Sequence, residues 1–177
     1  MKSRFAVLIG ALSLFVMTCS SSFSQQPAQP GEEHAVLKDL EGNWDAVIKF
    51  GSEQSKGTST SKMGLGGLWL LTEFKGDTGG APFEGRGIDG YDPDKKKYVS
   101  VWADSMTSSL MNFEGTYDPK TKTMTSVGEG KGHDGKPAKF KTTTAFPDKD
   151  HQVFKMFLFG PDGQDSPMLT IEYTRKK

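Results

Sequence analysis

The chain has 177 residues, enough for one domain of ordinary size with a short appendage. Its 22 basic residues equal its 22 acidic residues, and removal of a leader containing Lys2 and Arg4 would lower the basic count to 20. A nucleic-acid partner would need a basic face, so this slightly acidic balance argues against one.

The N-terminal 24 residues predict a secretory signal peptide. Lys2 and Arg4 give a positive start, and thirteen mostly apolar residues follow from Phe5 to Met17 before a polar segment of small residues. Thirteen residues are too few to span a bilayer, so no membrane span is predicted. The expected location is periplasmic or secreted.

Two modes of processing remain open. Ser22 and Ser24 occupy the small-residue positions before a cut that would leave Gln25 as the first mature residue. Alternatively, Cys19 in VMTC would become the lipidated first residue of an anchored lipoprotein. With ordinary cleavage the sole cysteine is lost, so the exported protein has no disulfide and depends on its core for stability.

The mature chain begins with a leader and a single short helix. Residues 25–33, QQPAQPGEE, are polar and Pro-rich and predict a disordered leader. The segment EEHAVLKDLEG then has apolar residues at helical spacing and ends in Gly42, which suits a glycine cap. The folded domain is expected over residues 34–177.

From Trp44 onward the apolar residues alternate with period two, and turn residues recur about every dozen positions. About ten strands are expected, and the short turns make neighbours in sequence neighbours in space. The predicted fold is therefore all-β: an antiparallel up-and-down barrel of about ten strands with one short N-terminal helix, closed so that no edge is exposed.

Gly85, Gly87 and Gly90 match the spacing G-x-G-x-x-G, but the match predicts a hairpin. A dinucleotide site needs a helix after the glycines, whereas Pro93, three lysines and an alternating strand follow here. A partial second copy of the same tip occurs at Phe113–Val127. A meander produces such copies when alternate turns lie at one end.

Gly42-Asn43-Trp44 follows the predicted helix, opens the first strand, and resembles the G-x-W signature of lipocalin-like (calycin) proteins. In those barrels the tryptophan closes one end and an arginine of the last strand packs across its indole face. The resemblance implies that role for Gly42, Trp44 and Arg175.

Besides Gly42 and Trp44, six further segments of the chain carry a second resemblance: GGLWLLTEFKG, PFEGRGIDGYD, KKKYVSVWADSM, EGTYDP, GPDG and EYTRK. In these segments the chain resembles a bacterial family of exported proteins, the domain-of-unknown-function 1579 family. The resemblance implies the barrel fold and an extracytoplasmic address, and it implies no activity, catalytic residue or cofactor.

Alternation gives the first and last strands an apolar inner face if Trp44 and Arg175 point inward. The inner residues would be Trp44, Ala46, Ile48 and Phe50 in the first strand, and Leu169, Ile171 and Tyr173 in the last.

One polar cluster is a candidate ligand site. Trp102 and Asp104 share a face of one strand, Asn112 and Glu114 share a face of the next, and Arg86 would lie across from them. Two carboxylates near an arginine could perform acid-base chemistry or hold a polar ligand. Alternatively, these residues form the solvated outer face of a half-buried sheet.

The three histidines predict no metal or haem site. His34 lies in the helix region, His133 in a glycine-rich loop and His151 in a turn, and none shares a strand face with another ligand type. A structural or exposed role is expected for each.

Alternating aromatic residues and methionines suit either a packed core or the wall of an apolar cavity. Three functions follow as hypotheses. The barrel binds a small apolar ligand in its interior, or it is an enzyme that uses Asp104, Glu114 and Arg86, or it is a filled barrel that acts through its loops as an interaction module.

Overall fold

The computed structural model describes residues 27–177 except residues 133 and 161–163. The signal-peptide, lipid-anchor and His133 predictions therefore lie outside the described residues. Within the described part, no helix is long and apolar enough to cross a bilayer.

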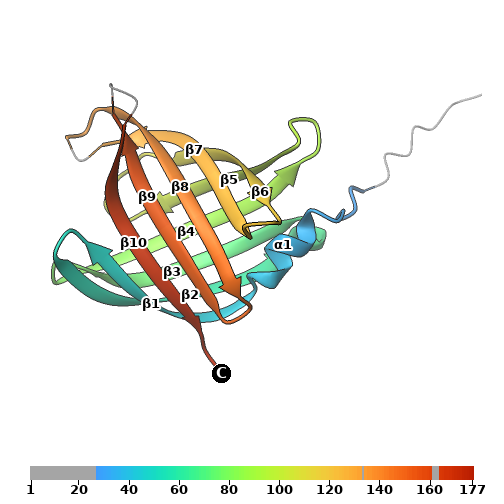
Figure 1. The fold of residues 1–177 in the computed structure, drawn as a ribbon, viewed down its shortest axis with the longest axis horizontal. Coiled ribbons are helices and arrows are strands. Elements are labelled where there is room, and N and C mark those ends of the chain that lie inside the picture. The colour runs from blue at the N-terminus through green and yellow to red at the C-terminus, as the bar shows by residue number, and fades with distance from the viewer. Residues whose placement is uncertain (1–26, 133, 161–163) are drawn as a thin grey trace, which may run out of the picture.

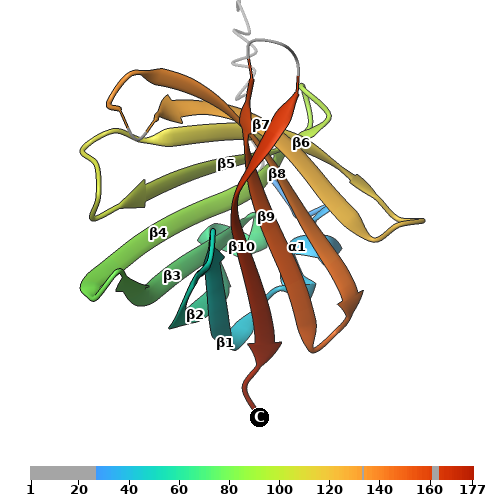
Figure 2. The ribbon, with the colours of Figure 1, turned by 60° about the vertical axis from the view of Figure 1, so that its left-hand side comes forward.

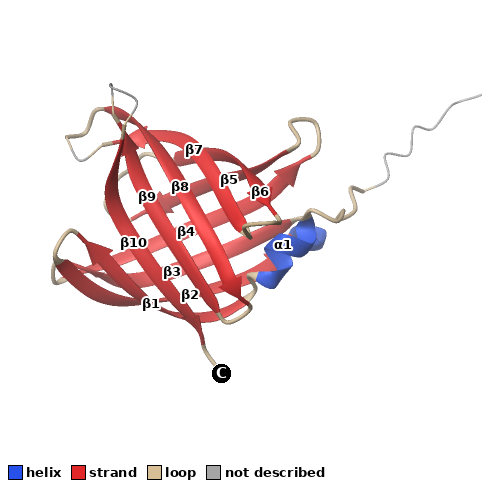
Figure 3. Cartoon of the chain, viewed as in Figure 1, coloured by secondary structure: helices blue, strands red, loops and turns tan. Residues whose placement is uncertain are grey.

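The domain consists of the short helix α1 (His34–Asp39), a 3-10 turn η1 (Leu65–Gly67) and ten strands (Figures 1 and 3). The strands are β1 (Gly42–Phe50), β2 (Glu53–Gly64), β3 (Trp69–Thr78), β4 (Ala81–Asp92), β5 (Lys97–Asp104), β6 (Met111–Asp118), β7 (Thr123–Lys131), β8 (Pro137–Asp148), β9 (His151–Phe159) and β10 (Asp165–Arg175).

Each strand pairs antiparallel with its neighbours in sequence, and β1 pairs with β10 to close the barrel. Figure 2 shows the strands tilted around the interior. The predicted all-β, up-and-down, ten-strand barrel with one N-terminal helix is confirmed. Among the ten described strands, closure leaves no unpaired sheet edge for another chain to extend.

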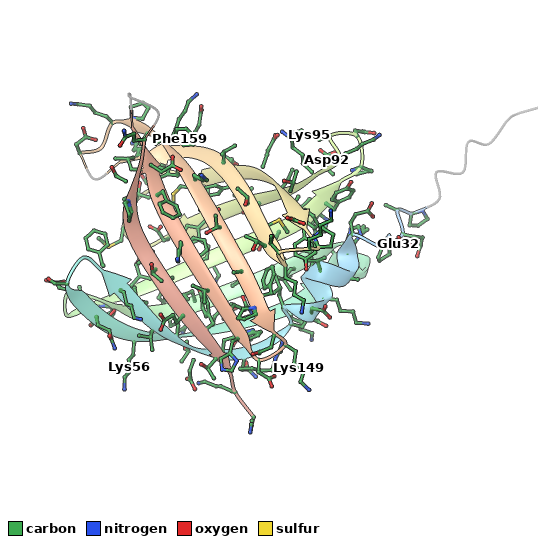
Figure 4. All side chains as sticks on the ribbon, in the orientation of Figure 1. Glu32, Lys56, Asp92, Lys95, Lys149 and Phe159 are labelled. Atoms are coloured by element: carbon green, nitrogen blue, oxygen red, sulfur yellow. The ribbon has the colours of Figure 1, made fainter. Side chains whose placement is uncertain are left out.

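The two ends of the barrel differ. The helix α1 and the β4–β5, β6–β7 and β8–β9 turns lie at one end, which we call the closed end; the β1–β2, β3–β4 and β9–β10 connections lie at the other, the open end. Figure 4 labels Asp92, Lys95 and Lys149 in closed-end turns and Phe159 at the open end.

The hairpin tips that repeat in the sequence both lie at the closed end, and an aspartate side chain stabilises the turn in each. An Asp92 carboxylate oxygen accepts hydrogen bonds from two turn amides, those of Asp94 and Lys95, at 3.0 Å each. Asp118 accepts from the amide of Lys120 at 2.9 Å in the second copy. These side chains satisfy backbone donors that the strand ladder cannot reach.

The helix α1 is held by packing, because six residues are too few for a stable isolated helix. Leu37 is buried against the closed end. His34 is also buried: its Nδ1 accepts a hydrogen bond from the Gly31 amide at 3.0 Å, and its ring meets Tyr91 edge-on. This histidine is part of the structure of the closed end.

Trp44 seals the closed end beneath α1. Its side chain is buried, and its indole Nε1 donates to the Leu40 carbonyl at 3.1 Å. The guanidinium carbon of Arg175 lies 4.0 Å from the centre of the Trp44 ring. The first and last strands are thus joined by a cation–π contact as well as by their ladder.

Arg175 also binds the chain that leads into β1. Its guanidinium donates to the carbonyls of Asp39 (2.8 Å) and Glu41, and to the Lys149 carbonyl (2.8 Å) in the β8–β9 turn. Gly42 has a φ of +135°, and a Cβ there would lie 2.5 Å from Nη1 of Arg175. Only glycine suits both the backbone angle and the space.

Arg175→Ala is expected to lower the free energy of unfolding by about 2–4 kcal/mol, since it removes charge-assisted hydrogen bonds and the cation–π contact. Lys176→Ala, which removes the neighbouring exposed pair with Asp45, is the control and should cost less than about 1 kcal/mol. Urea denaturation measures both. Equal losses in the two variants would contradict a closing role for Arg175.

Candidate ligand-binding cavity

The barrel encloses a cavity of about 930 Å³, here called the main cavity. Phe50, Gly79, Gly80 and Met106 line it at the open end, so this end forms its mouth. Barrels with more than about eight strands are wide enough to leave such a space. The interior therefore contains open space, which favours the apolar-cavity alternative over the packed core.

A smaller cavity of about 170 Å³, the inner cavity, lies at the closed end. Leu37, Leu40 and Trp44 line it, so α1 and the tryptophan form its floor. It shares several wall residues with the main cavity, which makes the two spaces neighbours. Those shared residues are Thr72, Asp89, Met124, Ser126, Thr144 and Tyr173.

The main cavity has an apolar wall. Ala46, Phe74 and Ile171 form a buried cluster against which partly buried apolar side chains pack. The inner faces predicted for the first and last strands do face the interior. Their lining residues are Ile48 and Phe50 from β1, and Leu169, Ile171 and Tyr173 from β10.

On β5, the face with Trp102 and Asp104 is the inner one. The indole Nε1 of Trp102 donates to Oδ2 of Asp104 at 3.0 Å, and the amide of Met106 donates to Oδ1 at 2.9 Å. Asp104 thus orients the indole and fixes the start of the β5–β6 loop at the mouth.

Asn112 and Glu114 lie on the opposite, outer face. Trp102 pairs with Met111, whereas Asn112 pairs with Val101. Residues paired across two strands point to the same side of the sheet, so this register turns Asn112 and Glu114 outward.

Arg86 is also outside the barrel. It forms an exposed ion pair with Glu73 at 2.5 Å, and Glu114 pairs with Lys95 at 2.6 Å. These partners lower the pKa values of both glutamates, and the hydrogen bond to the cation is the largest cause in each case. The five predicted residues therefore do not share a pocket, and the structure does not bring Asp104, Glu114 and Arg86 together.

Asp89 is the interior carboxylate that the sequence reasoning missed. It lies on the inner face of β4, lines both cavities, and is paired in register with Ser100. Burial raises the pKa of Asp89 to about 6, and a hydrogen bond with Ser100 lowers it in part. Asp89 follows Gly85 and Gly87 at period two, so the three residues share one face of β4.

The glycines that precede Asp89 make room for Trp102. A Cβ at Gly85 would lie 2.1 Å from Cζ2 of that indole, and one at Gly87 would lie 3.4 Å from Cε3. The first two glycines of the G-x-G-x-x-G match thus let a tryptophan lie close against the wall. The stretch itself is the β4–β5 hairpin, as predicted.

Hydroxyl groups concentrate toward the closed end. Ser61 and Thr72 lie within hydrogen-bond distance of each other, with 2.9 Å between their oxygens. The walls are therefore apolar along much of the main cavity and polar where the two cavities adjoin. The hydroxyl-bearing residues that line the inner cavity are Ser59, Ser61, Thr72, Tyr98, Ser126, Thr144 and Tyr173.

No metal centre is found among the described residues, where no three His, Cys, Asp or Glu side chains come close enough to hold an ion. His151 pairs instead with Asp148 at 2.9 Å in the β8–β9 turn.

The fold and the cavities define the class: a closed, hollow, ten-strand antiparallel barrel. The chain belongs to the family described as protein of unknown function (DUF1579), which matches it over residues 29–175. It matches none of the curated proteins with which it was compared.

Similar solved structures include the following two. The crystal structure of Rv2717c from M. tuberculosis has a TM-score of 0.61 and 12% identity, covering 83% of this chain and 99% of that chain. A redesigned beta barrel has a TM-score of 0.42 and 13% identity, with 80% and 96% covered. The likeness to Rv2717c shows the fold alone.

Gly85→Ala is expected to destabilise the protein by about 1–3 kcal/mol, because the new methyl group overlaps the Trp102 indole. Gly87→Ala, on the same face of the same strand, meets only ordinary contact and should change stability by less than about 1 kcal/mol. Denaturation midpoints give the comparison. Equal effects would show that Trp102 does not need the space at Gly85.

Asp89→Asn is expected to stabilise the protein at neutral pH. The pKa of Asp89 is raised from 3.8 to about 6, so the folded state holds the proton more tightly than the unfolded chain does. The contribution of Asp89 to the free energy of unfolding is therefore complete below about pH 4 and is lost as the pH rises through 6.

The free energy of unfolding of the variant should therefore be about 1–3 kcal/mol higher than that of the parent at pH 7.5. Near pH 4 the two free energies of unfolding should be similar. Asp94→Asn, in an exposed closed-end turn, removes the same charge as a control. If the parent and Asp89→Asn lost stability in parallel from pH 4 to 7.5, Asp89 would not be desolvated.

Proposed function

We propose that the protein binds a small, largely apolar molecule inside its barrel, as a carrier or sensor outside the cytoplasm. The observation that carries the proposal is the main cavity of about 930 Å³ with its apolar wall. Ligand sites are typically concave, mostly apolar and fitted with a few polar groups, and the interior has this character.

The mouth supports ligand entry from solvent. Phe50 and Met106 line the main cavity there and are 59% and 67% exposed. Exposed apolar side chains at a cavity entrance offer a first contact for an apolar molecule leaving water.

The alternative functions have weaker support. An enzyme built on Asp104, Glu114 and Arg86 would need those groups on one side of the sheet, whereas only Asp104 faces the interior. An interaction module built on a solid barrel is disfavoured by the cavity.

The location outside the cytoplasm is proposed from the sequence. The positive start, apolar stretch and small residues of the first 24 residues support export. A free periplasmic or secreted protein is the proposed form, with an anchor at Cys19 as the alternative.

A neutral fluorescent probe, N-phenyl-1-naphthylamine, tests binding to the purified protein. Thr144 lines both cavities, so the larger side chain of Thr144→Phe would fill space that the probe occupies. This variant should weaken probe binding by about tenfold or more. Thr143→Phe is the control, because Thr143 is next in the chain and on the other face of β8.

Both variants should keep the far-ultraviolet circular dichroism of the parent. Absence of probe fluorescence with the parent protein, or equal binding by the two variants, would overturn the proposed function.

A further inference from the structure

The two cavities carry negative charge and no positive charge. Among the described residues that line them there is no lysine, arginine or histidine. The acidic lining residues are Glu53, Asp77, Asp89 and Asp104. A ligand with an anionic group would therefore meet like charges and no counter-ion, at a cost that rises in a low-dielectric interior.

Three of the four carboxylates lie at the mouth, and two of these accept hydrogen bonds from neighbouring groups. Asp77 accepts a hydrogen bond from the amide of Gly80 at 2.7 Å, in the β3–β4 turn. Asp104 accepts from the Trp102 indole and from a loop amide. Glu53 is exposed at the start of β2.

Asp89 differs in both place and partners. It lines both cavities, away from the mouth, and its hydrogen-bond partner is the neutral hydroxyl of Ser100. An ionised carboxylate has about four acceptor sites, so one hydroxyl leaves most of this capacity facing the cavities. Its raised pKa is still below 7, so it is mostly ionised at neutral pH.

Hydroxyl acceptors lie on other walls of the same region. Thr72 of β3, Ser126 of β7 and Thr144 of β8 line both cavities, as Asp89 does. An ammonium group has three N–H donors and no acceptor, so it suits a carboxylate in a region whose other walls carry hydroxyl oxygens. The apolar wall on the mouth side, with Phe74 and Phe154, would take a hydrocarbon body.

Resting on the proposed function, we propose that the barrel selects amphipathic amines: Asp89 binds the ammonium group where the two cavities adjoin, and the apolar body extends toward the mouth. The charge-assisted hydrogen bond to Asp89 supplies the selectivity, and the apolar wall supplies affinity for any molecule with the same body.

Three ligands of equal chain length separate these contributions: decylamine, decanol and decanoate, each measured by displacement of N-phenyl-1-naphthylamine at pH 7.5. We expect decylamine to bind about tenfold or more tightly than decanol, and decanoate to bind weakest. Asp89→Asn should weaken decylamine binding by about tenfold while changing decanol binding by less than about threefold.

Two matched variants test whether Asp89 acts by direct contact. Asp104→Asn removes a charge at the mouth and keeps an acceptor for the indole, and Asp94→Asn removes a charge in an exposed closed-end turn. Both should retain the preference for the amine. If Asp104→Asn lost that preference as fully as Asp89→Asn did, the assignment to Asp89 would be overturned. The preference would then come from the summed electrostatic potential of the acidic lining residues.

The outcomes also separate this inference from the proposed function. Binding of decanol and the probe, with decanoate as tight as decylamine, would overturn the amine selectivity and leave the binding function intact. Failure of the probe and all three ligands to bind would overturn the proposed function itself.

Discussion

The contact of Arg175 with Trp44 joins the first and last strands at the closed end of the barrel. A barrel that encloses about 930 Å³ of space has few side chains meeting at its centre, so it relies on its closed strand ladder and on its ends. The pair lies at the seam between β1 and β10, and Arg175 also ties that seam to the chain leaving α1 and to the β8–β9 turn. A firm closed end allows the middle of the barrel to remain open.

The wall of the cavity depends on close packing against glycine. Because Gly85 has no side chain, the Trp102 indole lies against β4, and Asp104 fixes its orientation. The same strand carries Asp89 inward two residues beyond Gly87. The stretch that matches the spacing of a nucleotide-binding motif thus makes room for Trp102 in the cavity wall and places the carboxylate of Asp89 in the interior.

The sequence predicts the strands, the closed topology and the end of the barrel at which the repeated turns lie. It also predicts the inner faces of β1 and β10, because the apolar alternation in these two strands is unambiguous. It does not predict which face of β6 is inside. That choice depends on the β5–β6 register, in which Trp102 pairs with Met111 and Asn112 is turned outward. Asp89 was missed because no inner face was assigned to β4 from the sequence; in the structure Ile88 is 43% exposed on the outer face and Asp89 beside it lines the cavities.

Native mass spectrometry of the protein purified from its own host, compared with its mass after denaturation, tests directly whether the barrel carries a ligand. We expect an added small organic molecule that is released on denaturation and has a basic nitrogen on an apolar body. A native mass equal to that of the polypeptide alone would contradict stable carriage in the barrel.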